Sequence, residues 1–119
     1  MAVERAYDLW LWLDARVTDF PAHARHGVGH AILGASIDLM TSLLRATYTP
    51  REDPRAREAL AASNGHLALL RLLLRGARER RYLAIGQHEH AVERLAELGR
   101  MVGGWWKRTT SLQTGLRDA

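Results

Sequence analysis

The sequence predicts an all-α fold, an antiparallel up-down bundle of four helices. Apolar residues recur at steps of three and four in four separate segments, which is the spacing of a helix face. Proline occurs only at positions 21, 50 and 54, so the segments between these positions are uninterrupted. A chain of 119 residues is long enough for one domain with a core. We therefore expect a bundle over residues 1–108, with helices at about 3–19, 21–47, 54–81 and 85–102.

The first predicted helix, residues 3–19, carries a heptad-like apolar stripe. Its members are Val3, Ala6, Trp10, Leu13, Val17 and Phe20. Trp12 lies off this stripe, and we interpret it as a contact with another subunit. Phe20 should end the helix, because a residue before proline is pushed out of the α region, and Pro21 suits the first turn of the next helix. So short a turn requires the second helix to fold back beside the first.

The second predicted helix, residues 21–47, has an apolar face wider than one stripe. One set recurs at helical spacing (Val28, Ala31, Ile32, Ala35, Leu39, Leu43 and Ala46), and a second set lies to one side (Leu33, Ile37, Met40 and Leu44). Such a helix needs more than one neighbour. Gly27, Gly29 and Gly34 each cost about 1 kcal/mol relative to alanine, so we expect close backbone approach there.

Three histidines share one face of this second helix. His23, His26 and His30 stand at i, i+3 and i+7, a spacing that lets imidazoles share a metal ion. No carboxylate or cysteine stands near them as a further ligand, so a polar surface is the favoured interpretation, and no metal site is predicted.

The third predicted helix, residues 54–81, has the clearest start and the clearest core face. Asp53-Pro54 combines an N-cap residue with proline at the first helical position. The inward stripe is Leu60, Ser63, Leu67, Leu70, Leu74 and Ala77. Leu72 and Leu73 widen the apolar face beyond what one core requires, which predicts a subunit contact.

The fourth predicted helix, residues 85–102, should present inward a stripe made of Ile85, His88, Val92, Leu95, either Leu98 or Gly99, and Val102. Gly103-Gly104 should end it. Trp105 then offers an apolar anchor beside Lys107 and Arg108. Residues 109–119 are polar and lack periodicity, so we expect a disordered carboxyl-terminal tail.

Positive charge is concentrated in the second half of the chain. Residues 71–108 hold nine cations and four anions, a balance of +5, so the rest of the chain sums to −1 against a total of +4. Arg71, Arg75 and Arg78 form one row on the third helix, and Arg81 could extend it. The row indicates either a polyanion or acidic-protein partner, or arginines that flank an oligomer seam.

Motifs of catalysis and metal binding are missing from the sequence. It contains no cysteine, no HExxH, no Glu-x-x-His pair, no phosphate-binding glycine loop and no G-x-S-x-G elbow. No apolar run approaches the roughly 18 residues of a membrane span. We expect a non-catalytic cytoplasmic protein without a cofactor, a metal or a membrane partner.

Three stretches of sequence resemble one protein family. They are Tyr7-Asp8-Leu9-Trp10-Leu11-Trp12-Leu13 followed by Phe20-Pro21, Arg25 and Gly29; Leu70-Arg71-Leu72-Leu73-Leu74-Arg75 with His90; and Gly99-Arg100-Met101-Val102-Gly103-Gly104-Trp105. This combination resembles the accessory variability determinants, four-helix-bundle proteins of diversity-generating retroelements. A sister family, encoded in intervening sequences of bacterial 23S ribosomal RNA, shares much of the pattern. Gly27 and Ala84 depart from it, standing where the family often has threonine and a serine helix cap.

The resemblance implies a homopentameric barrel that binds a reverse transcriptase and its template RNA, with DNA as a further ligand, in support of mutagenic cDNA synthesis. Together with the charge pattern, it identifies as candidate binding residues Arg25, Arg71, Arg75, Arg78, Arg81, Arg100, Lys107 and Arg108. The candidate oligomer contacts are Trp12, Leu72, Leu73 and Trp105. The alternative is an intervening-sequence-type oligomer with a scaffold role and no specific nucleic-acid function.

Overall fold

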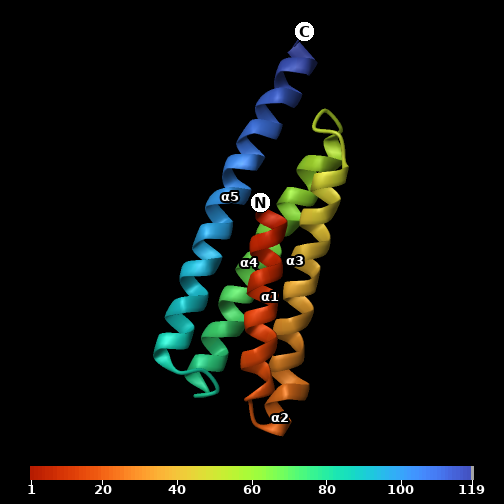
Figure 1. Cartoon of the computed structure of the whole chain (residues 1–119). Coiled ribbons are helices and arrows are strands. Elements are labelled where there is room, and N and C mark those ends of the chain that lie inside the picture. The colour runs from red at the N-terminus through yellow and green to blue at the C-terminus, as the bar shows by residue number, and fades with distance from the viewer. Residues whose placement is uncertain (119) are drawn as a thin grey trace.

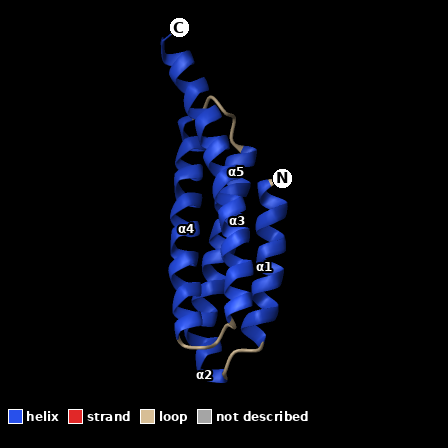
Figure 2. Cartoon of the chain, turned by 90° about the vertical axis from the view of Figure 1, so that its left-hand side faces the viewer, coloured by secondary structure: helices blue, strands red, loops and turns tan. Residues whose placement is uncertain are grey.

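The computed structural model describes residues 1–118 and contains no strand over that range. Its elements are α1 (Ala2–Thr18), α2 (Ala22–Ala24), the π-helical turn η1 (Arg25–Gly29), α3 (His30–Tyr48), α4 (Pro54–Glu79) and α5 (Ile85–Asp118). Because α2, η1 and α3 follow one another with no loop between them, although the helix is kinked at Gly27, the chain forms four long helical segments. Successive segments run in opposite directions and lie side by side (Figures 1 and 2), in a molecule of 56 × 22 × 19 Å. The predicted all-α class and its four helices are confirmed.

Asp53 begins α4 as the sequence predicts. Its carboxylate accepts a hydrogen bond from the Arg55 backbone N–H at 2.9 Å, and Pro54 occupies the first helical position. Side-chain hydrogen bonds from Arg55 hold the pKa of the Asp53 carboxyl below its ordinary value of 3.8. Because the folded pKa is depressed, the stabilisation from this cap is present above the unfolded pKa and is lost as the pH falls through the folded value.

The second helical segment is broken near its start rather than continuous from residue 21. Gly27 has non-helical angles (φ −99°, ψ −108°), and the chain makes a π-helical turn before α3 begins. The expected close approach is present at Gly29, where an added Cβ would lie 2.7 Å from Val17 Cγ1 and 3.0 Å from the Ala24 carbonyl oxygen. It is wrong for Gly27 and Gly34, where an added Cβ would meet nothing within 4 Å.

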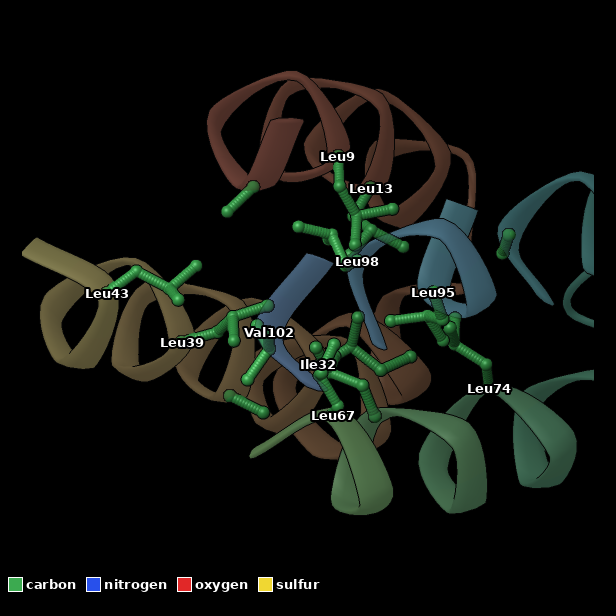
Figure 3. Close-up of a cluster of buried hydrophobic side chains, with 14 of the residues drawn as sticks. Leu9, Leu13, Ile32, Leu39, Leu43, Leu67, Leu74, Leu95, Leu98 and Val102 are labelled. Carbon is green, nitrogen blue, oxygen red and sulfur yellow. The ribbon is translucent and has the colours of Figure 1, made fainter. Parts of the chain in front are cut away.

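The core is a column of leucines contributed by all four helical segments (Figure 3). The larger side chains that are fully buried are Leu9, Leu13, Ile32, Leu39, Leu43, Leu60, Leu67, Leu70, Leu74, Leu95, Leu98 and Val102. The whole stripe predicted for α4 is buried. Within it Ser63 meets Ser42 of α3 across the core at 2.7 Å, and each hydroxyl also contacts a backbone carbonyl, so neither is left unpaired.

Two predicted core faces are confirmed for most of their members and wrong for a few. In α1 Leu9 is fully buried, whereas Trp10 is only partly buried. In α5 Ala91 takes an inward position, whereas Ile85 and Val92 are exposed. The other members of both stripes include Leu13 and Val17 of α1 and Leu95, Leu98 and Val102 of α5, which are buried as predicted.

One segment, Ala22–Tyr48, is long and apolar enough to cross a membrane by length and composition, contrary to the expectation from the sequence. This is weak evidence for a membrane helix, because a buried core helix satisfies the same criterion. Ile32, Leu39 and Leu43 of this segment are fully buried against the other helices.

The helix predicted to end at residue 102 continues to Asp118, so the predicted disordered tail is wrong for residues 109–118; Ala119 lies outside the described residues. Gly103 and Gly104 remain helical because the residues after them make contacts. Thr109 is fully buried, and the Gln113 side-chain amide donates to the carbonyl oxygens of Arg51 at 3.1 Å and Asp53 at 2.9 Å. These two hydrogen bonds fasten the loop between α3 and α4 to the end of α5.

Replacing Gln113 with alanine is expected to lower the free energy of unfolding by about 1–2 kcal/mol, because this change removes two hydrogen bonds to the loop. Urea titration followed by circular dichroism measures the change. Thr114→Ala is the matched control, since Thr114 is exposed on the same turn. Equal stability of both variants would contradict the role given to Gln113.

Candidate nucleic-acid interface

The arginine row on α4 follows from the register of that helix. Leu67, Leu70 and Leu74 are buried on the core face. Arg71, Arg75 and Arg78 lie beside this face, where Arg71 and Arg75 are exposed and Arg78 is also accessible to solvent. The row borders α5 at Arg71, whose Nη2 would lie 3.1 Å from a Cβ added at Gly99. The missing side chain at Gly99 therefore makes room for a guanidinium beside α5.

Few carboxylates neutralise this row. Within residues 1–118 the ion pairs are Arg5–Glu97 at 3.2 Å, Arg55–Asp53 at 2.7 Å and Arg75–Glu79 at 3.1 Å. The pair in the row, Arg75–Glu79, is exposed on both sides, so its contribution to stability is small. Arg71 and Arg78 have no carboxylate partner among the described residues. The row therefore keeps most of its positive charge available to a partner.

Arg81 does not extend the row along the helix, because α4 ends at Glu79. The chain closes the helix with hydrogen bonds from Arg81 N–H to Arg78 O at 2.9 Å and from Tyr82 N–H to Ala77 O at 2.8 Å. Arg81 itself lies in the left-handed region with φ 64°, a place where glycine is usual. Its side chain starts from the turn that follows the row.

Replacing Arg81 with glycine is expected to stabilise the fold by about 1 kcal/mol, because a non-glycine residue in the left-handed region costs roughly 1–2 kcal/mol. The midpoint of urea unfolding measures this gain. Arg80→Gly is the control, since Arg80 has ordinary right-handed helical angles and should lose stability on the same change. A decrease in the stability of Arg81→Gly would contradict the assigned strain.

Arg25 lies at the end of the bundle near the α4–α5 turn. His23 and Ala24, just before it, line one cavity together with Arg80 and Tyr82. Its Nη1 donates to the Thr18 carbonyl oxygen at 3.4 Å. A cation in this place stabilises the carboxyl end of α1, whose carbonyls lack partners in the helix. The Arg25 side chain is otherwise exposed to solvent at that end.

The remaining predicted binding residues, Arg100, Lys107 and Arg108, belong to α5 and are exposed. Arg100 and Arg108 line a cavity of about 530 Å³ that Lys107 does not line. Arg51 of the α3–α4 loop completes this cluster, and sequence reasoning missed it. The structure thus places three of the predicted residues in the row on α4 and two, Arg100 and Arg108, in a cluster on α5, whereas Arg25, Arg81 and Lys107 belong to neither.

The residues predicted as oligomer contacts differ in how far their side chains are buried within a single chain. Trp12 is half-buried: its ring lies 4.9 Å from that of His90, and the Arg16 guanidinium covers it at 5.4 Å. Leu73 and Trp105 are partly buried against the core, whereas Leu72 is 64% exposed. Other exposed apolar side chains lie on α1 and α3, namely Tyr7, Leu11, Ile37 and Leu44.

The histidines are dispersed rather than gathered. Among residues 1–118 no cluster of three histidine, cysteine, aspartate or glutamate residues could hold a metal ion. His23 Nε2 instead lies 3.2 Å from the Tyr82 hydroxyl, a contact that joins α2 to the turn before α5.

A sequence model of the bAvd-like family matches residues 1–109. The matched range includes the arginine row and the cluster on α5, and it ends within α5. No curated protein matches the chain.

Proposed function

Because this chain belongs to the bAvd-like family, we propose that it is a non-catalytic accessory protein of a diversity-generating retroelement. In this role it binds the element's reverse transcriptase and the template RNA, and it supports mutagenic cDNA synthesis in the cytoplasm. The arginine row on α4 is the proposed nucleic-acid contact, and DNA made from the template is a second ligand for it.

The observation that carries the proposal is the solvent-accessible row itself. Arg71, Arg75 and Arg78 lie along one side of a long helix, and Arg75 alone among them has a carboxylate nearby. Guanidinium groups bind phosphate oxygens through two hydrogen bonds at once, and successive turns of a helix can follow a phosphate backbone. Contacts to phosphates do not depend on the nucleotide sequence, which fits a protein that binds a template RNA.

The proposed assembly is a homopentamer. Exposed apolar side chains support it, because contiguous apolar surface marks interaction sites. On α4 Leu69 and Leu72 are 46% and 64% exposed, and about one turn separates them. Five copies would carry a charge of five times +4, that is +20, which attracts RNA strongly at low salt.

RNA binding measured by fluorescence anisotropy tests this function. We expect the affinity for a labelled structured RNA to fall by about 10²-fold or more between about 50 and 200 mM salt. RNAs of unrelated sequence should bind with similar affinity, because the contacts are to phosphates. The absence of binding at low salt, or an affinity that salt does not change, would contradict the proposed RNA contact and favour a scaffold role.

A further inference from the structure

A cavity of about 530 Å³ lies where the start of α1, the end of α3, the α3–α4 loop and the middle of α5 meet. Its volume falls in the range of roughly 300–1,000 Å³ that small-molecule sites occupy. Arg51, Arg100 and Arg108 lie on its wall, and so does Trp105. The cavity is therefore large enough for a ligand with both a charged and a flat part.

The charge of this cavity is uncompensated. None of the residues that line it is acidic. Its three arginines take part in none of the ion pairs among the side chains of residues 1–117. Three guanidinium groups that line one cavity without a carboxylate form a binding site for an anion. Phosphate matches the geometry of their N–H donors best.

The backbone of Arg51 is fastened to α5, and the Arg108 side chain lies along that helix. Gln113 donates to the Arg51 carbonyl oxygen at 3.1 Å, which fixes the loop that carries this residue. Arg108 lies back along α5, with Nη1 3.4 Å from where a Cβ at Gly104 would stand. The absence of a side chain at Gly104 thus leaves room for the Arg108 guanidinium at the cavity.

The hydroxyl groups of the cavity are suited to accept rather than donate. Thr47 Oγ1 donates to the Leu43 carbonyl oxygen at 2.9 Å, and Thr49 Oγ1 donates to the Arg45 carbonyl oxygen at 2.6 Å. Their protons are therefore committed, and only their lone pairs remain for a ligand. The oxygens of a phosphate accept hydrogen bonds, so they would bind the arginines. Ribose hydroxyls or base amino groups could instead donate hydrogen bonds to the threonine hydroxyl oxygens.

The cavity also has an apolar and aromatic part. Trp105 and Met101 line it from α5, and Val3 lines it from α1. Trp105 is only partly buried, so part of its ring is accessible from the cavity. A base stacked on an aromatic ring gains about 1–3 kcal/mol in single-stranded complexes, irrespective of its sequence.

We propose that this cavity binds a nucleotide, with its phosphate on Arg51, Arg100 and Arg108 and its base against Trp105. The nucleotide can be one unit of a bound RNA strand or a free mononucleotide. The case of the RNA strand rests on the proposed RNA-binding function. The cavity is separate from the α4 row, because no residue of the row lines it.

The test combines two ligands with two double variants. AMP is titrated by calorimetry, with adenosine as the uncharged comparison, and a single-stranded RNA is titrated by anisotropy. Arg100→Gln with Arg108→Gln alters the cavity, and Arg71→Gln with Arg78→Gln removes the same charge from the row. We expect the cavity variant to bind AMP at least about tenfold more weakly and the row variant to bind it within about twofold of the parent protein.

Each result bears on one of the two proposals. AMP binding that is undetectable, no better than that of adenosine, or equally reduced in both variants would overturn the nucleotide site even if RNA still binds. AMP binding abolished only in the cavity variant establishes the site, even if the parent protein fails to bind RNA and the proposed function falls. A parallel decrease in RNA affinity identifies the strand as the source, and an unchanged RNA affinity identifies the free nucleotide. Arg51→Gln provides a third variant in case the double change unfolds the protein.

Discussion

Reversing the charge of the α4 row, by Arg71→Glu, Arg75→Glu and Arg78→Glu together, is expected to lower the affinity for RNA by about 100-fold or more at low salt. Each arginine binds about one phosphate, and each replacement also adds a repelling charge. The dependence of log affinity on log salt should become shallower by about 0.7–0.9 for each phosphate that is no longer neutralised. Anisotropy titrations at several salt concentrations measure both effects.

The fold should survive this change, because none of the three side chains is buried and, among the side chains that the structure describes, Arg75 is the one of the three that makes an ion pair. Arg45→Glu with Arg117→Glu is the control, since both residues are exposed on other helices. The control should lower the affinity much less per reversed charge. Dissociation of the assembly in the triple variant, with RNA binding retained by the separated chains, would instead identify the row as an oligomer seam.

Gly29→Ala is expected to destabilise the protein by about 1–3 kcal/mol, the usual cost of overpacking. A methyl group at this position would stand 2.7 Å from Val17 Cγ1 and 3.0 Å from the Ala24 carbonyl oxygen. The Val17 methyl group can move, but the backbone oxygen cannot move without reshaping the turn from α2 into α3. The gain in helix propensity, about 1 kcal/mol, offsets only part of this cost.

Gly34→Ala is the matched opposite case in the same helical segment. Nothing lies within 4 Å of the added methyl group, so the variant should be more stable by about 0.5–1 kcal/mol. Thermal and urea unfolding of the two variants, beside the parent protein, measure the difference. Equal shifts for both glycines would contradict the close packing of α1 against the second helical segment at Gly29.

The sequence determines α4 almost completely because local and tertiary signals agree there. Asp53-Pro54 provides the start, and six residues at helical spacing, from Leu60 to Ala77, are all buried. In α1 and α5 the periodicity predicts most of the buried face but not every member of it. Whether Leu9 or Trp10 is buried depends on the neighbouring helices, which the sequence of one helix cannot specify.

The predicted end of the last helix is wrong for a related reason. Gly103-Gly104 is a helix stop by local rules, but the burial of Thr109 and the hydrogen bonds of Gln113 favour continuation. Gln113 reaches carbonyl groups 62 and 60 positions earlier in the chain, and no spacing rule reveals such a pair. Tertiary contacts therefore override the local signal.

The two basic sites, the row on α4 and the cluster at the cavity, also differ in how far the sequence predicts them. Arg71, Arg75 and Arg78 form a row because of helical spacing alone, so the sequence predicts it directly. The cluster joins Arg51 to Arg100 and Arg108 across the α3–α4 loop, and only the folded chain brings these residues to one cavity. Helical spacing also assigns Arg81 to the row, but the turn after Glu79 redirects the chain before that residue.

Light scattering during size-exclusion chromatography, with and without a structured RNA, tests the central claim most directly. We expect a particle of about 67 kDa, five times the 13.4 kDa of one chain, that gains the mass of the RNA at about 50 mM salt and releases it at higher salt. A 13.4 kDa particle that ignores RNA at every salt concentration would contradict both the proposed assembly and the proposed nucleic-acid contact.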